Sequence, residues 1–165
     1  MSHARILQIN VSRGGVPKLP IAKGKITEVG LEGDSHAHPQ IHGGPIQAIL
    51  IITDEGIEEL KAEGFALYPG ALGENITTQG LDRHQVRAGQ RYRVGESILE
   101  ITKIRRPCDT LSVYGPGIQK AVYDADVKAG DAASARWGLS GFYCAIVRPG
   151  TIRPGDPIVL MDQSV

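Results

Sequence analysis

Cys108 stands in a sequence context that could support thiol chemistry. It follows two arginines and a proline in the segment KIRRPCDTLS, residues 103–112. A free thiol has a pKa of about 8.5, and neighbouring cations such as Arg105 and Arg106 lower it, which favours the thiolate that acts as a nucleophile or binds soft metals. Pro107 donates no hydrogen bond and keeps the preceding residue extended, so strand pairing is expected to stop there. We therefore expect Cys108 to emerge at a strand end as a reactive residue, the alternative being an inert thiol.

The second cysteine, Cys144, lies in a different setting. Its segment, FYCAIV, is an apolar strand-like run in which a cysteine behaves as a small hydrophobic residue. The two thiols could pair, but a cytoplasmic chain usually keeps its cysteines reduced, and the sequence contains neither a CxxC motif nor zinc-ribbon spacing. Cys144 is therefore predicted to be a core residue.

A polar loop, GDSHAHPQIHGGP, carries the second group of candidate residues. Asp34, His36, His38 and His42 have the side chains that zinc or iron prefers, and a histidine-bound zinc in a hydrolase is one hypothesis for this loop. The alternative is an ordinary polar loop. Two glycines, Gly43 and Gly44, precede a buried strand and would let the backbone approach a ligand closely, or form a simple turn.

The third group lies in GALGENITTQG, residues 70–80. Glycines bracket an acid, an amide and two hydroxyls, contributed by Glu74, Asn75, Thr77 and Thr78. Such a set of donors and acceptors suits a polar heterocycle. The segment matches neither a Walker loop nor a GxGxxG fingerprint, and a plain surface loop is the alternative.

Four arginines gather in RHQVRAGQRYRV, residues 83–94: Arg83, Arg87, Arg91 and Arg93. A solvated face is the ordinary interpretation of such a stretch, and a phosphate-bearing ligand is the alternative.

Short strands and turns must position these groups. Alternating or continuous apolar residues predict strands at 5–12, 24–30, 46–52, 75–78 and 141–147, a hairpin over 91–104 that turns at Gly95–Glu96, and a last strand at 157–161. Thr53 as N-cap, followed by two acids and closed by Gly64, predicts a helix over 53–64, and a second helix is expected over 117–130.

Length and composition favour one mostly-β domain. The chain has 165 residues, with 21 glycines and 10 prolines. So many glycines and prolines are typical of a fold with many short elements joined by tight turns. We predict an α+β fold over residues 1–165 as a single domain: a closed or partly open β-barrel of about seven strands with two or more peripheral helices.

Charge and hydropathy exclude several classes of partner. Formal net charge is zero, from 18 basic and 18 acidic residues, which argues against bulk electrostatic binding to nucleic acid or to a membrane. The sequence has no apolar run of membrane-spanning length and no signal-peptide pattern, so a cytoplasmic location is expected. Nothing in the sequence indicates the oligomeric state.

Taken in order, four segments of this chain resemble the MOSC domain, the module named from the C-terminal part of molybdenum cofactor sulfurases. The segments are VGLEGDSHAHPQIHGGPIQAI, GALGENITTQGL, VRAGQRYRVGESILEITKIRRPC and GFYCAIVRPGTIRPGDPIVL. The resemblance covers nearly the whole chain, and it implies a stand-alone MOSC protein with a β-barrel fold.

The resemblance assigns a role to Cys108. In the family, the cysteine of the R-x-P-C element is the signature residue, proposed as a sulfur acceptor in sulfurase-related members and as the molybdenum ligand in members that reduce N-hydroxylated compounds. Carried to this chain, it implies a molybdenum-cofactor-binding oxidoreductase, with a sulfur-carrier or cofactor-delivery module as the alternative, in which Cys108 becomes a persulfide. The residues expected around the molybdopterin are Asp34, His42, Gly43, Gly44, Glu74, Asn75, Thr77, Arg105 and Arg106.

This chain also departs from larger family members. It shows no aminotransferase-like domain, so no pyridoxal phosphate is expected on the chain itself, and no cysteine-rich iron–sulfur segment. The expected partners are therefore a separate electron donor or a cysteine desulfurase. The resemblance alone does not decide between the enzyme and the carrier.

Overall fold

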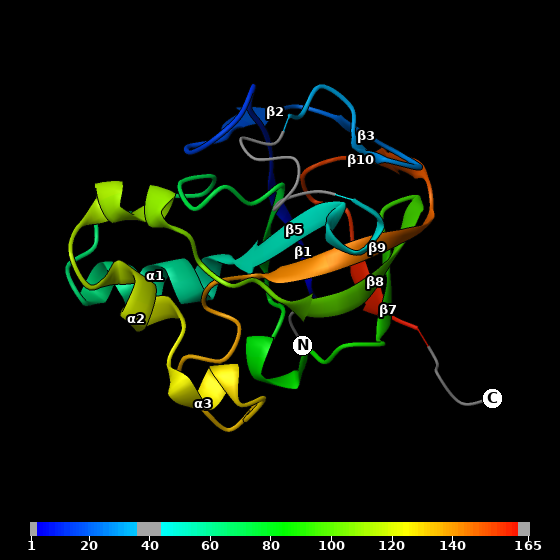
Figure 1. Cartoon of the computed structure of the whole chain (residues 1–165). Helices are drawn as coiled ribbons and strands as arrows, with labels where there is room; N and C mark the ends of the chain where they lie inside the picture. Colours follow the sequence, from blue (N-terminus) through cyan, green and yellow to red (C-terminus); the bar gives the residue numbers. More distant parts are fainter. Residues whose placement is uncertain (1–2, 36–43, 162–165) are drawn as a thin grey trace.

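The computed structural model describes residues 3–35 and 44–161, and these form a mostly-sheet α+β fold with the helices gathered on one side of the sheets (Figure 1). The strands of the described residues are β1 (Arg5–Val11), β2 (Leu19–Ile21), β3 (Gly24–Thr27), β4 (Gly30–Leu31), β5 (Ile49–Thr53), β6 (Ile76–Gln79), β7 (Arg91–Val94), β8 (Ser97–Ile104), β9 (Phe142–Arg148), β10 (Gly150–Ile152) and β11 (Ile158–Leu160). The helices are α1 (Asp54–Ala62), α2 (Ile118–Val122) and α3 (Ala125–Lys128), with short 3-10 helices η1 (Pro45–Gln47), η2 (Arg83–Gln85) and η3 (Asp109–Tyr114).

The strands form two sheets. The larger has the order β11-β7-β8-β9-β5-β6-β1-β2, and the smaller has the order β10-β3-β4. Strands β5 and β6 are parallel, and the other strand pairs in the described residues are antiparallel. Backbone bonds also join the start of β1 to the chain just before β11, where Ile6 donates to the Asp156 carbonyl and accepts from Gly155. The sheet order itself is open, so the predicted closed or partly open barrel is not confirmed, whereas the mostly-sheet class is.

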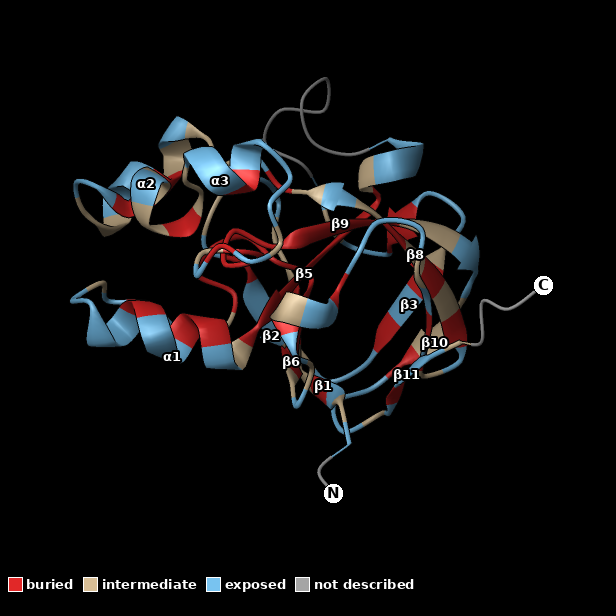
Figure 2. Ribbon diagram, turned by 90° about the horizontal axis from the view of Figure 1, so that it is seen from below, coloured by how far each residue is buried: buried red, intermediate tan, exposed pale blue. Residues whose placement is uncertain are grey.

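One hydrophobic core lies between the two sheets. It contains side chains from both, including Ile26 of β3 and Ile152 of β10, and Figure 2 shows buried stretches on strands of both sheets. In β1, Ile6 and Ile9 both point inward although they are three residues apart, because the register shifts between Ile6 and Gln8. In a regular strand, residues three apart point to opposite faces, and the bulge is the physical reason for the difference.

A second core lies under α1. Ile57 and Leu60 on one face of this helix are fully buried and pack with Leu72, Leu111 and Ile118. Thr53 caps the helix as predicted, since its side chain accepts a hydrogen bond from the Gly56 N–H at 3.1 Å.

The 91–104 hairpin and most of the predicted strands are found. The single strand predicted over 24–30 is instead two short strands, β3 and β4, with a turn at 28–29, and the strand predicted over 46–52 begins only at Ile49, after η1.

The strand count also differs. The described residues form eleven strands rather than about seven, because β2, β4 and β10 have only two or three residues and show no alternation in the sequence. The hairpin turns at Gly95–Glu96 as predicted, with Val94 opposite Ser97.

The single helix predicted over 117–130 is wrong. Two short helices, α2 and α3, replace it, separated by Tyr123 and Asp124 in extended conformations. The Asp124 side chain accepts a hydrogen bond from the Val127 N–H at 2.8 Å, so it caps a new helix instead of continuing the old one.

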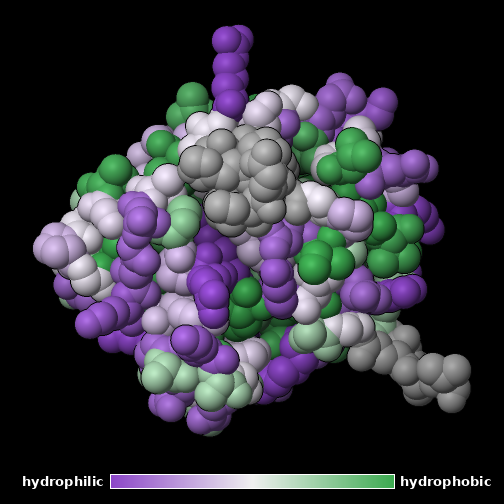
Figure 3. All heavy atoms as spheres, in the orientation of Figure 1, coloured by the Kyte–Doolittle hydropathy of each residue, from purple (hydrophilic) through white to green (hydrophobic). Residues whose placement is uncertain are grey.

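No helix in the described parts of the chain combines the length and hydropathy needed to cross a bilayer. The face drawn in Figure 3 is mostly hydrophilic, with hydrophobic residues in small separate groups.

Candidate functional site

The end of β8 places Cys108 at the molecular surface. The strand stops at Ile104, and Cys108 follows Pro107 in an extended conformation as the residue before η3. Its carbonyl accepts a hydrogen bond from the N–H of Leu111, whose buried side chain anchors η3 in the second core. The thiol is partly exposed, and its Sγ lies 2.8 Å from the Thr110 hydroxyl. The prediction that this thiol emerges where a strand ends is confirmed.

A pocket of about 740 Å³ opens beside the thiol. Strand β7 pairs with β8 only over Ser97–Glu100, whereas β9 pairs with it as far as Ile104. The last residues of β8 therefore lack a neighbouring strand on one side, and the pocket lies along this edge. Its lining residues are Gln47, Val86, Ala88, Ile101, Thr102, Lys103, Ile104, Arg106, Pro107, Cys108, Tyr123, Val127, Gly130, Trp137, Phe142 and Tyr143.

Two cations line the pocket near the thiol. Arg106 is exposed and has no ion-pair partner among the described residues. Lys103 is also exposed, and its Nζ lies 6.0 Å from the centre of the Tyr143 ring, within range of a cation–π contact. An anionic group entering the pocket would therefore meet two positive charges close in sequence to Cys108.

Arg105 has a different position from Arg106. It is buried, and its Nη1 donates to the Leu72 carbonyl at 2.6 Å, while its Nε has no hydrogen-bond partner among the described residues. Its guanidinium also hydrogen-bonds the Tyr143 side chain. Arg105 thus connects the chain before Cys108 to the loop before β6 and to β9.

Tyr143 lines the pocket and contacts Arg105. Burial raises its pKa; the Arg105 guanidinium opposes that shift, and the Cys108 thiol adds to it. The phenol is therefore protonated at neutral pH.

Polar residues of the other two candidate loops meet in a buried network. Asp34 forms an ion pair with Lys18 at 2.7 Å and accepts hydrogen bonds from the Ser12 N–H and the Asn75 amide, each at 2.9 Å. Asn75 in turn accepts from the Leu50 N–H at 3.0 Å, which ties the network to β5. These contacts fix the two loops relative to each other.

Glu74 and Thr77 complete the interior of this network. Glu74 is fully buried; its Oε2 accepts from the Gly70 N–H at 3.0 Å and from the Thr77 hydroxyl at 2.9 Å, while its Oε1 has no partner among the described residues. Burial raises the pKa of Glu74, and the backbone and Thr77 hydrogen bonds and the Arg105 charge oppose that shift. Asn10 of β1 donates to the Glu74 carbonyl and to Thr77, each at 3.2 Å.

The predicted site residues thus fall into two groups in the structure. Cys108 and Arg106 line the pocket, whereas Asp34, Glu74, Asn75, Thr77 and Arg105 form or adjoin the buried network. Gly44 precedes η1 with a φ of 85°, a conformation that favours glycine. His36, His38, His42 and Gly43 lie outside the described residues, so the histidine–zinc hypothesis stays a prediction. Within residues 3–35 and 44–161, no cluster of three histidine, cysteine or acidic residues could hold a metal.

Several residues of the site were missed at the level of sequence. Lys18, Asn10 and Trp137 stand in segments with no motif, and only the presence of polar residues in an apolar strand could have indicated Asn10. Lys103 and Tyr143 lie in segments that the sequence analysis singled out, but nothing in those segments marked them as site residues. The four-arginine stretch is not a uniform solvated face: Arg83 is buried and donates to the Trp137 and Ala135 carbonyls.

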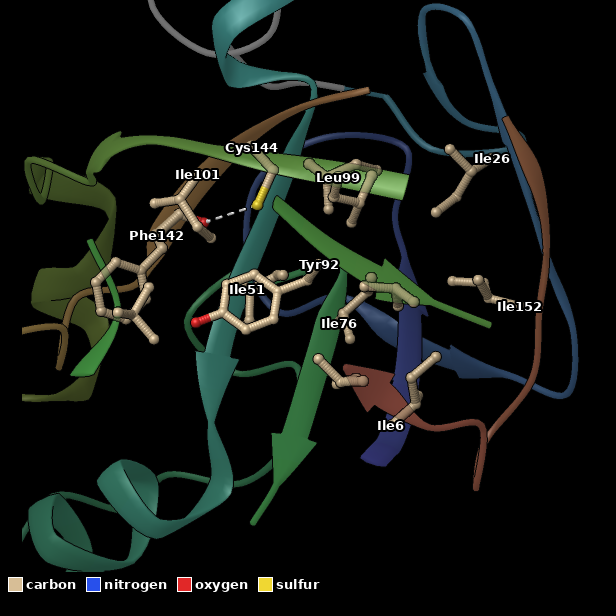
Figure 4. Close-up of a cluster of buried hydrophobic side chains, with 14 of the residues drawn as sticks. Ile6, Ile26, Ile51, Ile76, Tyr92, Leu99, Ile101, Phe142, Cys144 and Ile152 are labelled. Carbon is tan, nitrogen blue, oxygen red and sulfur yellow. Dashed lines mark hydrogen bonds between the residues drawn. The ribbon is translucent and has the colours of Figure 1, made fainter. Parts of the chain in front are cut away.

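Cys144 is buried in the first core, as predicted (Figure 4). Its neighbours in Figure 4 are hydrophobic side chains such as Leu99, Ile101 and Phe142. Burial raises the pKa of its thiol far above the usual range, so it stays protonated.

A family model for the MOSC domain matches residues 38–159 of the chain. The chain belongs to the MOSC domain family. The match includes β5 to β11, the pocket and Cys108.

Among curated proteins, the chain is 28% identical over 142 residues to Protein YiiM of Escherichia coli, covering 84% of this chain and 59% of that protein. It is also 28% identical over 139 residues to a protein of Gibberella moniliformis named Reductase, covering 81% of this chain and 23% of that protein. The chain thus spans less than two thirds of the length of either relative.

Solved structures confirm the fold of this MOSC domain. The crystal structure of YiiM from Geobacillus stearothermophilus superposes with a TM-score of 0.72 and 26% identity, covering 98% of this chain and 77% of that one. YUAD protein from Bacillus subtilis gives a TM-score of 0.71 at 22% identity and covers 98% of both chains, a likeness of fold alone.

Proposed function

We propose that this MOSC domain binds the molybdenum cofactor through Cys108 and acts as a molybdenum-dependent oxidoreductase on N-hydroxylated compounds. The observation that carries the proposal is the half-exposed thiol on a pocket whose nearby cations, Lys103 and Arg106, suit an anionic ligand. Family membership supports cofactor binding, and the relative named Reductase supports a redox activity.

The residues present fit this cofactor. The pocket volume of about 740 Å³ lies in the range of small-molecule sites, roughly 300–1,000 Å³. A thiolate is a soft ligand, and Cys108 is the accessible thiol of the described residues. A molybdopterin phosphate is an anion, and guanidinium and ammonium groups are the side chains that bind such anions.

In this proposal each residue of the pocket has a separate task. When bound, the cofactor supplies a metal centre that exchanges electrons with a substrate. Arg106 and Lys103 hold its phosphate, and Cys108 provides the sulfur ligand. The protonated Tyr143 phenol, which Arg105 hydrogen-bonds, lines the same pocket as a polar group of the binding surface. The electrons come from a separate donor protein.

A sulfur carrier is the second candidate, favoured by the exposure of Cys108 and by the hydroxyl of Thr110 at 2.8 Å from its Sγ. In this reaction the Cys108 thiolate attacks the outer sulfur of a persulfide on a donor such as a cysteine desulfurase. A new S–S bond forms at Cys108, the S–S bond of the donor breaks, and the donor leaves as a thiolate. No net oxidation or reduction takes place.

The molybdenum and pterin content of the purified chain tests the first proposal. The protein is produced in a host that makes the cofactor and purified without oxygen, as wild type, Cys108→Ala and Cys144→Ala. We expect wild type and Cys144→Ala to carry molybdenum and pterin in equal amounts and Cys108→Ala to lose about tenfold or more. Equal molybdenum and pterin contents in wild type and Cys108→Ala would show that Cys108 is not the ligand.

Alkylation followed by mass measurement tests the carrier. After incubation with a persulfide donor, a carrier shows one additional sulfur on the Cys108 peptide of the cofactor-free chain, and Cys144 shows none. A Cys108 peptide without added sulfur, in a chain that binds molybdenum, would decide in favour of the oxidoreductase.

A further inference from the structure

The pocket is lined by apolar and aromatic residues as well as by the thiol and its cations. The walls that we call the apolar recess are formed by Val86, Ala88, Tyr123, Val127, Trp137 and Phe142, five of which belong to or pack against the first core. The recess and the thiol belong to one cavity, which residues 101–104 of β8 also line. From Ile101 to Ile104 the strand covers about 10 Å at roughly 3.3 Å per residue. A cavity of about 740 Å³ has room for a molecule of one or two rings.

The walls of the recess are held in place by hydrogen bonds. Trp137 Nε1 donates to the Val86 carbonyl at 3.1 Å, and buried Arg83 donates to the Trp137 carbonyl at 2.5 Å. The Arg87 guanidinium lies 5.4 Å from the centre of the Trp137 ring. Val127, another wall residue, belongs to α3, which Asp124 caps. A recess with fixed walls binds a rigid body at little conformational cost.

Charged side chains are few among the residues that line the cavity. The charged side chains among its lining residues are Lys103 and Arg106, and both belong to the segment that leads into Cys108. The recess offers only apolar and aromatic surface together with the Tyr123 phenol. Burying a charge there would be costly, whereas an uncharged aromatic ring would gain from burial and from contact with the Trp137, Tyr123 and Phe142 rings.

We propose that the apolar recess is the subsite for an uncharged aromatic ring of the substrate, whose reacting atom it presents at Cys108. This rests on the proposed function, in which Cys108 lies at the reacting centre. The recess then selects aromatic over short polar substrates, and the Trp137 wall is the main determinant of that selection.

Two thiol reagents with the same reacting group test the subsite on the cofactor-free chain. Iodoacetamide is small and polar, and iodoacetanilide adds a phenyl ring. Rates of Cys108 labelling are measured by peptide mass and divided by the rates for glutathione. We expect a rate ratio of at least about tenfold in favour of iodoacetanilide, with saturation as its concentration rises and quenching of Trp137, the single tryptophan of the chain.

Filling the recess supplies the matched comparison. Ala88 is exposed and lines the recess, so Ala88→Phe or Ala88→Leu occupies it without disturbing the core, and both are expected to abolish the preference. Ala62→Phe, at an exposed position on α1 outside the pocket, should leave the preference for iodoacetanilide unchanged. Equal normalised rates for the two reagents, or an unchanged preference in both Ala88 variants, would overturn the subsite while leaving a reactive Cys108. No labelling of Cys108 by either reagent would overturn the proposed function as well.

Discussion

The two cysteines show how position along a strand decides the chemistry of a residue. Cys108 follows a strand end and a proline, and lies partly exposed on a pocket, whereas Cys144 lies inside β9 within the core. This contrast could be predicted from the sequence, because a run of apolar neighbours and a strand-ending proline are local signals.

The roles of the charged network residues could not be predicted in the same way. Lys18 and Asp34 are both buried as a pair, with side-chain exposures of 8% and 4%, yet nothing in the sequence around Lys18 distinguishes it from a surface lysine. Arg105 and Arg106 are adjacent, and only the structure separates the buried one from the one on the pocket.

Removing the buried ammonium should be far more harmful than removing an exposed one. Lys18→Met leaves the buried Asp34 carboxylate without its counter-charge, and we expect a loss of about 3–5 kcal/mol in the free energy of unfolding. Lys25 pairs with Glu32 at 4.0 Å with side-chain exposures of 70% and 65%, so Lys25→Met should cost about 0–1 kcal/mol. Urea unfolding of both variants measures the difference, and equal losses would contradict the structural role of the Lys18–Asp34 pair.

Glu74 should make stability depend on pH. Its folded-state pKa lies above the ordinary value of 4.5, so the folded state favours the protonated acid. The stability that this provides is fully present below the unfolded-state pKa and is lost as pH rises through the folded-state pKa. Glu74→Gln keeps the acceptor for Gly70 and Thr77 and cannot ionise. We therefore expect the melting temperature of the variant to exceed that of wild type at pH 7 to 8. This difference in melting temperature should disappear below about pH 4.5.

The control for this prediction is Glu58→Gln, at an exposed position on α1. The difference in melting temperature between this variant and wild type should not grow as pH rises. A Glu74→Gln protein that melts below wild type at neutral pH would mean that the ionised carboxylate is the stabilising form.

At the scale of elements, the sequence predicted what periodicity and capping specify. The N-cap of α1, the β7–β8 turn and the end of β8 were all predicted correctly, since each depends on a few neighbouring residues. The break between α2 and α3 was missed because Asp124 can either continue a helix or cap one, and Ser134, which hydrogen-bonds it at 3.0 Å, is ten residues away.

The α3 cap should control the apolar recess. Asp124→Ala removes the acceptor for the Val127 N–H, so we expect faster amide hydrogen exchange over residues 125–130 and a weaker preference of Cys108 for iodoacetanilide. Asp126→Ala, on the exposed side of the same helix, keeps the cap and should keep both properties. Unchanged exchange in Asp124→Ala would show that the cap does not hold α3 in place.

At the scale of the whole molecule, the fold brings together segments that are distant in sequence. The buried network joins β1, the loop before β6 and Asp34, and Arg105 connects it to the pocket on β8 and β9. The sequence predicted the mostly-sheet class and the candidate loops, but not which of their side chains face the protein interior. That information depends on strand order and on the bulges in β1 and β8, which no local pattern specifies.

Protection of Cys108 by the cofactor is the most direct test of the account. Chain purified with molybdenum cofactor and chain freed of it are treated with iodoacetamide, and the two cysteine peptides are measured by mass. We predict that Cys108 is labelled in the cofactor-free chain and protected in the loaded chain, while Cys144 stays unlabelled in both. Equal labelling of Cys108 with and without cofactor would contradict the claim that its sulfur holds the cofactor in this pocket.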